Sequence, residues 1–371
     1  MNLRYSINKI DHSVIFCKDE KLEKISRFLQ NFENDKNILF LFDSKIDKKI
    51  VEKIFNELKI SGCNIIKIEC VSEKLNKNET LLFKILDVLL ENKFTKKSIV
   101  ISFGGGVLGD VSALASSLYL RGLNYICIPT TMTAMVDSSI GGKTAINYKG
   151  ITNSIGTYYH PRIVFILEHI FKTLPEREFL AGIPEIIKCG IIEDKSILQI
   201  LRSKQSNVMK RDTNIIFKLC YLTLKTKIKY FLNDIYEKNK RLSLNFGHTF
   251  AHAIEMAIEK KTKKDFIRHG EAVGIGMLCE VFYEKKKKEK IFQTIEDLLK
   301  RYNLPTKLFL KEIPFTKAKL QNAIYQNIFL DKKRIGKNPR YISIKKLQKS
   351  NISEILDLNF LNETIMKIIH D

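Results

Sequence analysis

Residues 98–120 read SIVISFGGGVLGDVSALASSLYL, and this stretch determines the fold class that we predict. Its first six residues form a short apolar run rich in β-branched side chains, which is typical of a buried strand. Glycines follow directly, and the residues after Asp110 form a helix-like pattern. Glycines between a strand and a helix let the backbone approach a pyrophosphate, and the helix N-terminus adds the positive end of its dipole. The stretch therefore predicts a pyrophosphate-binding α/β domain, although the same glycines would also suit a tight turn without a ligand.

The residues before this stretch show the same alternation of strand and helix. Runs of β-branched residues at 37–42 and 63–70 predict strands. Apolar residues at helical spacing follow each run, at 48–58 and 80–91. Such alternation indicates a parallel sheet with helices on both faces.

The pattern changes after about residue 175. Apolar residues then recur at spacings of three and four, and β-rich runs become rare. This favours a mostly helical second domain. We place the boundary at Pro175, which gives an α/β domain over residues 1–174 and a helical domain over residues 175–371.

The composition bears on the partners of the chain. It has 371 residues, of which 44% are hydrophobic, and a formal net charge of +22. A charge of this size raises the question of nucleic-acid binding, but the lysines are spread along the whole chain and accompany no zinc-finger spacing or RNA-binding signature. We therefore expect a basic surface that attracts a small anionic substrate, and no nucleic-acid partner.

Three features of the sequence bear on its location. The longest apolar stretch, residues 99–120, contains three consecutive glycines and an aspartate, so it does not predict a membrane span. The start of the chain lacks the long apolar run of a signal peptide. The seven cysteines form no C-x-x-C pair, which favours reduced thiols. We expect a cytoplasmic protein without a membrane partner.

Three short motifs carry polar groups that could belong to a binding site. Two threonines, beginning at Thr130, follow an apolar run at 124–129, and hydroxyls at a strand end can bond a phosphate or a nicotinamide amide. The Gly-Gly-Lys turn that ends at Lys143 could hold a substrate oxyanion, with the lysine as a point charge. Glu185 and Lys188 share a face of a predicted helix, among isoleucines that disfavour a fully solvated face. Without a ligand these would be a hydroxyl-rich loop, a turn and an ion pair.

Histidines gather in one segment of the chain. Three of the seven fall within residues 245–271, in NFGHTFAH and HGE. Neutral imidazole is the commonest metal ligand, and two histidines with one carboxylate and an open position make a catalytic zinc site. The i, i+4 spacing alone selects His248 and His252 as the pair of ligands. The cluster therefore indicates a metal or phosphate site, whereas a single histidine on a helix would more often be structural.

Together the motifs resemble those of the dehydroquinate synthase family. In order they read GGGVLGD, YLRG, PTTMTAMVDSSIGGK, LPEREFLAGIPEIIKCG, RLSLNFGHTFAHAIE, HGEAVGIGM and DKK, and the match runs from about Asp43 to Arg340. The resemblance implies an N-terminal Rossmann-like α/β domain and a mostly α-helical C-terminal domain. It also implies an active site in the cleft between them, and a homodimer.

The resemblance also assigns roles to individual residues. It implies metal ligation by Glu185, His248 and His269, in place of the pair that spacing selects, and it places His252 near the substrate phosphate. Arg121 would reach the active site of the neighbouring subunit. The other substrate contacts that it implies are Asp137, Lys143, Asn153, Lys188, Lys227, Arg241, Asn245 and one of Lys332 and Lys333. The NAD contacts that it implies are Asp43, Glu73, Gly105, Gly106, Asp110, Thr130, Thr131, Thr173 and Leu174.

The chain departs from the family pattern at three places. Thr152 stands where the family has a lysine near the cofactor and the substrate, unless nearby Lys149 takes that role. The family's G-E-x-x-K reads SEKLN here, so a second lysine on the cofactor side is shifted or lost, and Lys74 or Lys77 could compensate. Ile235 replaces an acidic residue. These departures bear on the identity of the substrate more than on the reaction class.

The activity that the resemblance implies is that of a carbon–oxygen lyase, which converts 3-deoxy-D-arabino-heptulosonate 7-phosphate into 3-dehydroquinate and phosphate. NAD takes a hydride from a ring carbinol, phosphate leaves by β-elimination, the hydride returns, and an intramolecular aldol step closes the carbocycle. The metal, zinc or cobalt, stabilises the alkoxide. Two alternatives stay open. One is a sugar phosphate cyclase that acts on another sugar, such as sedoheptulose 7-phosphate, and the other is a metal- and NAD-dependent polyol dehydrogenase, which would release NADH.

Overall fold

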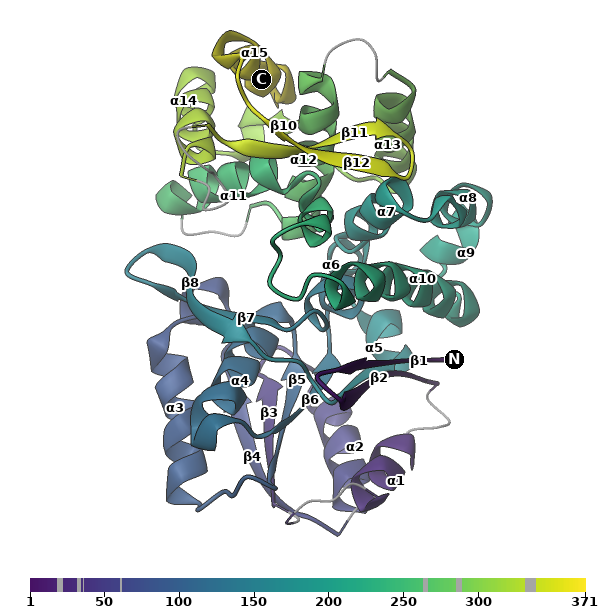
Figure 1. The fold of residues 1–371 in the computed structure, drawn as a ribbon, viewed down its shortest axis with the longest axis vertical. Helices are drawn as coiled ribbons and strands as arrows, with labels where there is room; N and C mark the ends of the chain where they lie inside the picture. Colours follow the sequence, from purple (N-terminus) through teal and green to yellow (C-terminus); the bar gives the residue numbers. More distant parts are fainter. Residues whose placement is uncertain are drawn as a thin grey trace. The chain divides into compact units, whose positions relative to one another are not determined.

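The structure of the chain is a computed structural model, which describes residues 1–18, 23–31, 35, 37–60, 62–262, 266–284, 289–330 and 338–371. It divides into two compact units, Met1–Pro175 and Glu176–Asp371 (Figure 1). The prediction of an α/β fold followed by a mostly helical one is confirmed. The active-site cleft that we expect between them stays a prediction.

A seven-stranded sheet in the order β1-β2-β9-β6-β5-β3-β4 forms the centre of the first unit. Its strands are β1 (Asn2–Ile7), β2 (Ile10–Cys17), β3 (Asn37–Asp43), β4 (Asn64–Cys70), β5 (Ile99–Gly104), β6 (Asn124–Pro129) and β9 (Ile163–Leu167). Neighbouring strands pair in parallel, except that β1 and β2 form an antiparallel hairpin at one edge. All six residues of β5 are buried, as expected of a parallel strand that is covered on both faces.

Helices cover both faces of this sheet. They are α1 (Glu23–Asn31), α2 (Lys48–Lys59), α3 (Glu79–Glu91), α4 (Gly106–Leu118) and α5 (Glu168–Thr173), with single turns at Lys74–Asn76, Tyr119–Arg121 and Ala134–Ser138. In Figure 1, α3 and α4 lie on one face of the sheet, and α1 and α2 lie on the other. A separate antiparallel hairpin consists of β7 (Lys143–Tyr148) and β8 (Ile151–Tyr158).

The strand order reverses between β3 and β5. The strand after β3 in the chain, β4, lies on one side of it, and the next strand, β5, lies on the other side. Open α/β sheets bind ligands at the carboxyl ends of the strands beside such a switch point. Asp43 ends β3 and Gly104 ends β5, so the glycine stretch lies where a ligand is expected.

The second unit is built mostly from helices. They are α6 (Glu176–Leu180), α7 (Ile183–Ile192), α8 (Lys195–Ser203), α9 (Gln205–Met209), α10 (Thr213–Leu232), α11 (His248–Thr262), α12 (His269–Tyr283), α13 (Glu289–Arg301), α14 (Lys317–Ile328) and α15 (Leu358–Ile368), with 3-10 turns at Lys240–Asn245 and Leu310–Glu312. Two small sheets pair β11 (Arg340–Lys346) with β12 (Lys349–Glu354), and β10 (Leu308–Phe309) with β13 (Ile369–His370). Every helix in the described parts of the chain is too short or too polar to span a bilayer.

Two glycines let α12 approach its neighbours closely. A Cβ added at Gly270 would lie 1.7 Å from the backbone oxygen of Ala181, and one added at Gly276 would lie 2.0 Å from that of Gly247. Neither distance leaves room for a side chain, so the close approach requires glycine. Ala181 lies just before α7, and Gly247 lies just before α11. These contacts therefore hold the first turns of α7, α11 and α12 near one another.

Candidate functional site

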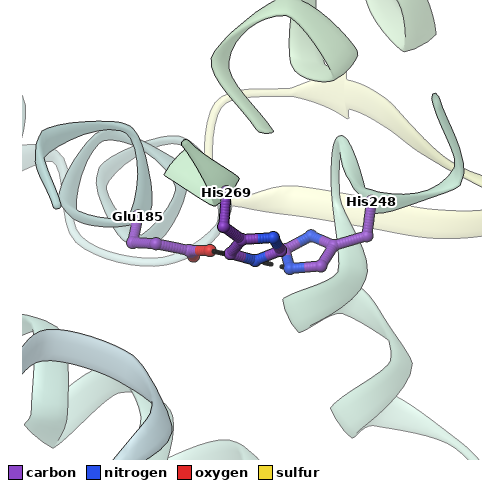
Figure 2. A group of neighbouring side chains, drawn as sticks. All are labelled: Glu185, His248 and His269. Atoms are coloured by element: carbon purple, nitrogen blue, oxygen red, sulfur yellow. Dashed lines mark ion pairs between the residues drawn. The ribbon is translucent and has the colours of Figure 1, made fainter. Parts of the chain in front are cut away.

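Three polar side chains converge at the N-terminal ends of helices in the second unit. Glu185 lies in the first turn of α7, and His248 and His269 are the first residues of α11 and α12. One potential ligand atom of each lies within 4.8 Å of the other two. Figure 2 shows both imidazole rings facing the carboxylate, with Nε2 of His248 3.6 Å and Nε2 of His269 3.5 Å from Oε1 of Glu185. The structure thus brings together the three residues to which the resemblance assigns the metal.

Hydrogen bonds set the orientation of the two imidazole rings. Nδ1 of His248 lies 3.2 Å from the backbone oxygen of Phe246, and Nδ1 of His269 lies 3.0 Å from Oε2 of Glu255. Both partners are acceptors, so we assign the proton of each neutral ring to Nδ1. The lone pair on each Nε2 then points toward Glu185. Metal-binding histidines are commonly held in this way, by a hydrogen bond from the other ring nitrogen.

The buried carboxylate of Glu185 completes the set of donors. Glu185 is 1% exposed, and its Oε2 forms an ion pair with Lys188, one turn further along α7. Its Oε1 faces Nε2 of both histidines. A buried carboxylate needs positive charge nearby, which Lys188 supplies on one side and either a protonated His269 or a bound metal supplies on the other. Two nitrogens and one oxygen fit a divalent metal ion that keeps an open coordination position.

The surroundings of His269 favour positive charge. Burial lowers the pKa of His269, but the carboxylates of Glu255 and Glu185 raise it more, to about 10. A bound metal must displace the proton from Nε2, since a ligating nitrogen needs its lone pair. The same two carboxylates that raise the pKa of the ring would also attract the metal.

His252 lies one turn beyond His248 on α11, outside the group that contains Glu185. It belongs with Glu255 and His269 to a second group of potential ligands, and its ring stacks on that of His269 with centroids 6.1 Å apart. Spacing along one helix therefore does not identify the histidine that joins His248 and Glu185, because that histidine comes from another helix. The structure is compatible with a substrate-facing role for His252, which stays a prediction.

Sequence reasoning missed Glu255. This residue follows His252 by three positions and His248 by seven, so the three side chains lie on one face of α11. That spacing is the signal that could have identified it. The side chain of Glu255 is buried and makes the contact with Nδ1 of His269 described above.

Substituting Glu255→Gln is expected to weaken metal affinity by about 10- to 100-fold, the usual effect of losing a carboxylate that orients a metal-binding imidazole. Competition between the protein and a chelator for Zn²⁺ measures the affinity, and thermal unfolding of the metal-free variant checks the fold. Glu259→Gln, one turn further along α11, is the matched control. Wild-type affinity in Glu255→Gln would show that this carboxylate does not orient His269.

Three predicted substrate contacts in the second unit are cationic and buried. Lys188 of α7, Lys227 of α10 and Arg241 of the turn at Lys240–Asn245 are each less than one-tenth exposed. Arg241 donates from Nη1 to the backbone oxygen of Ile235 at 2.6 Å. Three cationic groups buried within one helical unit suit an anionic ligand.

Asp234 holds the loop that carries Arg241 and Asn245. Its carboxylate accepts hydrogen bonds from three backbone N–H groups, including that of Arg241 at 3.1 Å. Burial raises the pKa of Asp234, but these donors and the charge of Arg241 outweigh it, so the pKa lies below its ordinary value. Asn245 donates from Nδ2 to Oε1 of Glu237 at 2.8 Å. An acidic side chain is thus present in the loop even though Ile235 departs from the family pattern.

In the first unit, predicted NAD contacts follow the carboxyl ends of adjacent parallel strands. Asp43 ends β3, Gly105 follows β5 and Thr130 follows β6. A Cβ at Gly105 would lie 3.1 Å from Cγ2 of Thr131, so a larger residue would crowd this turn. A small hollow that opens to solvent lies here, lined by residues that include Gly105, Gly106, Asp110, Ser138 and Lys143. The first turn of α4 borders this hollow, and the N-terminus of a helix favours an anion.

The remaining predicted NAD contacts lie around this strand edge or beyond it. The carboxylate of Asp43 accepts hydrogen bonds from the backbone N–H of Lys45, at 3.0 Å, and from the hydroxyl of Ser72. Glu73 is exposed and pairs with Lys45 at 3.1 Å. Thr173 ends α5 and Leu174 follows it, so this pair lies one helix beyond β9.

The predicted substrate contacts of the first unit lie on three short elements. The exposed Arg121 ends the turn at Tyr119–Arg121, and Asp137 lies in the turn at Ala134–Ser138. Lys143 begins β7, and Asn153 lies in β8 with a left-handed backbone at φ 50°. Lys332 and Lys333 fall outside the described residues.

Comparison with known proteins gives a consistent result across the chain. The family described as "3-dehydroquinate synthase N-terminal" matches residues 67–181, and "3-dehydroquinate synthase C-terminal" matches residues 182–334. The 3-dehydroquinate synthase of Thermodesulfovibrio yellowstonii is 32% identical over 100% of this chain and 99% of its own length. That of Ruminiclostridium cellulolyticum is 30% identical over the same shares.

Solved structures share the fold at lower identity. A 2-deoxy-scyllo-inosose synthase complexed with carbaglucose-6-phosphate, NAD⁺ and Co²⁺ has a TM-score of 0.85 at 22% identity, covering 99% of this chain and 100% of that one. The 2-epi-5-epi-valiolone synthase of Streptomyces hygroscopicus, with NAD⁺ and Zn²⁺ bound, has a TM-score of 0.81 at 21% identity, covering 98% of each chain.

Proposed function

This chain belongs to the 3-dehydroquinate synthase family, and we propose that it converts 3-deoxy-D-arabino-heptulosonate 7-phosphate into 3-dehydroquinate and phosphate with the help of NAD and a divalent metal ion. The observation that carries the proposal is the convergence of Glu185, His248 and His269 in a chain that matches these synthases over its full length. Each of the three comes from a different helix, so their meeting depends on the packing of α7, α11 and α12.

The metal would bind to Glu185 and to Nε2 of both histidines. When bound, it would act as a Lewis acid on a hydroxyl of the substrate, while NAD would carry a hydride away from the substrate and back. Zinc suits two nitrogens and one oxygen, and cobalt suits them too. The solved relatives hold Co²⁺ in one case and Zn²⁺ in the other.

NAD would bind at the switch point of the parallel sheet. The glycine turn before α4 would approach the pyrophosphate, with the N-terminus of α4 behind it. The carboxylate of Asp43 would accept hydrogen bonds from a ribose, as acidic residues near such strand ends commonly do. The hydroxyls that follow β6 would bond the phosphates or the nicotinamide amide.

The substrate carries a carboxylate at one end and a phosphate at the other. The buried cations Lys188, Lys227 and Arg241, with Lys143 of the first unit, would bind and orient these two ends. Holding both ends fixes the ring between them, which lowers the entropic cost of each step. The net charge of +22 would also favour the approach of such an anion.

The family resemblance also bears on the oligomeric state and the location of the protein. We propose a homodimer in which Arg121, an exposed residue of the first unit, reaches the active site of the neighbouring subunit. We also propose a location in the cytoplasm, where the substrate of this reaction class and reduced thiols are both expected.

The reaction is redox-neutral, and this property separates it from a polyol dehydrogenase. We expect phosphate to appear from the heptulosonate phosphate while the absorbance of NADH stays flat, because each hydride that leaves the substrate returns to it. Phosphate release and NADH absorbance can be followed in one cuvette with NAD and Zn²⁺ supplied. NADH that accumulates in step with product would contradict the proposal and favour a dehydrogenase.

A second candidate function is a cyclase that acts on a different sugar 7-phosphate. Thr152, at a position where the family has a lysine near the substrate, is the observation that favours it. Both solved relatives named above are synthases of other cyclic products and share this fold. The two candidates would share the metal ligands and the proposed NAD site at the carboxyl ends of the parallel strands. Only the choice of substrate separates them.

A further inference from the structure

A buried lysine joins three elements of the first unit. Lys77 follows the turn at Lys74–Asn76 and is 9% exposed. Its Nζ lies 2.5 Å from Oδ2 of Asp110 in α4 and 2.5 Å from Oδ1 of Asn153 in β8. Asp110 is a predicted NAD contact, and Asn153 is a predicted substrate contact. One ammonium group therefore touches a residue of each kind.

Backbone contacts hold Lys77 and the hairpin together. The backbone N–H of Asn147, in β7, donates to the oxygen of Lys77 at 2.8 Å. Oδ1 of Asn147 accepts from the N–H of Asn153 at 2.9 Å. The left-handed backbone of Asn153 lies opposite an irregularity in the pairing of β7 with β8. On the other side, Asn78 caps α3 by accepting from the N–H of Leu81. The position of Lys77 is thus set by a helix start and by the hairpin.

The charge of Lys77 requires such partners. An ammonium group that is removed from water is costly unless it is paired and hydrogen-bonded. A carboxylate and an amide oxygen meet this requirement here, and the side chain of Asp110 is itself only 21% exposed. A charge-assisted bond in this setting is stronger than one at the surface.

Lys74, Lys77 and Lys149, the three lysines that could compensate for the two lysine departures from the family pattern, have different surroundings. Lys74 is exposed, and its backbone oxygen accepts from Nδ2 of Asn147 at 3.5 Å. Nζ of Lys149 lies over the ring of Tyr148, 5.5 Å from its centroid. Of these three described lysines, Lys77 is the buried one, and its ammonium contacts both Asp110 and Asn153.

We infer that Lys77 is a positioning residue that couples NAD binding at Asp110 to substrate binding at Asn153. The inference rests on the proposed function, since it takes the roles of Asp110 and Asn153 from it. Coupling of this kind is reciprocal: a change at Asn153 alters the affinity for NAD, and a change at Asp110 alters the affinity for substrate. The coupling disappears when the ammonium is removed.

The test measures the dissociation constant of NAD by calorimetry, without any sugar phosphate. Lys77→Met keeps the length of the side chain and removes its charge, and we expect about tenfold weaker NAD binding, the size of effect that loss of a charge-assisted hydrogen bond produces. Lys77→Arg should restore most of the affinity. Lys96→Met, an exposed lysine at the opposite end of β5, should leave it unchanged.

A second variant tests the coupling itself. Asn153→Gly removes the amide, and glycine adopts the left-handed backbone without strain, so this variant should fold. We expect it to weaken NAD binding about threefold in the wild-type background and to have no further effect in Lys77→Met, as for two residues that share one partner. A merely structural role of Lys77 would lower the melting temperature without making the two effects non-additive.

Three results would overturn the inference. Lys77→Met could bind NAD within twofold of wild type, Asn153→Gly could leave NAD binding unchanged in the wild-type background, or its effect could be equal in both backgrounds. Failure of the proposed function looks different. Wild-type protein that binds no NAD would contradict both the proposed function and the role of Lys77. Normal coupling with no turnover of the heptulosonate phosphate would contradict only the choice of substrate.

Discussion

His269→Ala is expected to remove the bound metal and to lower turnover by about 10³-fold or more, while the protein stays folded. His269 is one of three side chains that face a common point, and its Nε2 lies 3.5 Å from Glu185. Two donors hold a catalytic metal far more weakly than three. Lewis-acid stabilisation is worth several kcal/mol, which corresponds to a rate factor of about 10³ or more.

Metal content by mass spectrometry, turnover and circular dichroism together check this prediction. The matched control is His370→Ala, at the end of the chain, where the ring lies 3.3 Å from the backbone oxygen of Lys367. The control should keep both metal and rate. A folded His269→Ala protein that retained one equivalent of metal and its rate would show that the metal does not bind at Glu185, His248 and His269.

Lys143→Ala is expected to lower kcat/KM by about 10²-fold. Lys143 begins β7 at the end of the Gly-Gly turn and lines the same hollow as Gly105 and Asp110. A cation beside this hollow would stabilise negative charge on the substrate, and the loss of one such preorganised group commonly costs about 10²- to 10³-fold. The side chain is exposed, so its removal should leave the free energy of unfolding nearly unchanged.

The control for this variant is Lys96→Ala. Lys96 is also exposed and belongs to the same unit, but it precedes β5, whereas the glycine stretch follows that strand. Steady-state kinetics at saturating NAD and Zn²⁺ measure both variants. Equal effects of the two substitutions would mean that general positive charge, rather than a contact at residue 143, assists the substrate.

Much of the sheet could be predicted because each strand has a local signature. The runs at 37–42 and 63–70 became β3 and β4 within one residue at each end, and the segment at 124–129 became β6. Buried parallel strands carry uninterrupted β-branched residues, and the helices between them carry apolar residues at helical spacing. Neither signal depends on contacts with distant residues.

Other parts of the first unit had no such signature. The hairpin of β1 and β2 at the sheet edge and the hairpin of β7 and β8 were not predicted. All but one of the eight residues of β8 are exposed, so no apolar alternation marks that strand. The contacts of Lys77 could not be predicted from local sequence either, because its partners lie 33 and 76 positions away in the chain.

The candidate metal site also depends on contacts between distant residues, which local sequence patterns do not reveal. Spacing selects histidines on one helix, whereas the group in the structure combines the first turns of α7, α11 and α12. Those turns meet because Gly270 and Gly276 admit close contacts between backbones, and no local pattern encodes such an approach. The family resemblance supplied the ligand set that spacing could not, and Glu255 emerged only from the structure.

Phosphate release from 3-deoxy-D-arabino-heptulosonate 7-phosphate, compared with release from sedoheptulose 7-phosphate, tests the central claim most directly. Both sugars would be supplied to the same protein with NAD and Zn²⁺. We predict rapid release from the heptulosonate, which has the second anionic end that the buried cations suit, and little or none from the other sugar. Turnover of sedoheptulose 7-phosphate with no release from the heptulosonate would contradict the claim. That result would assign the chain to a different cyclase reaction, and the proposed metal site and NAD site would be unaffected.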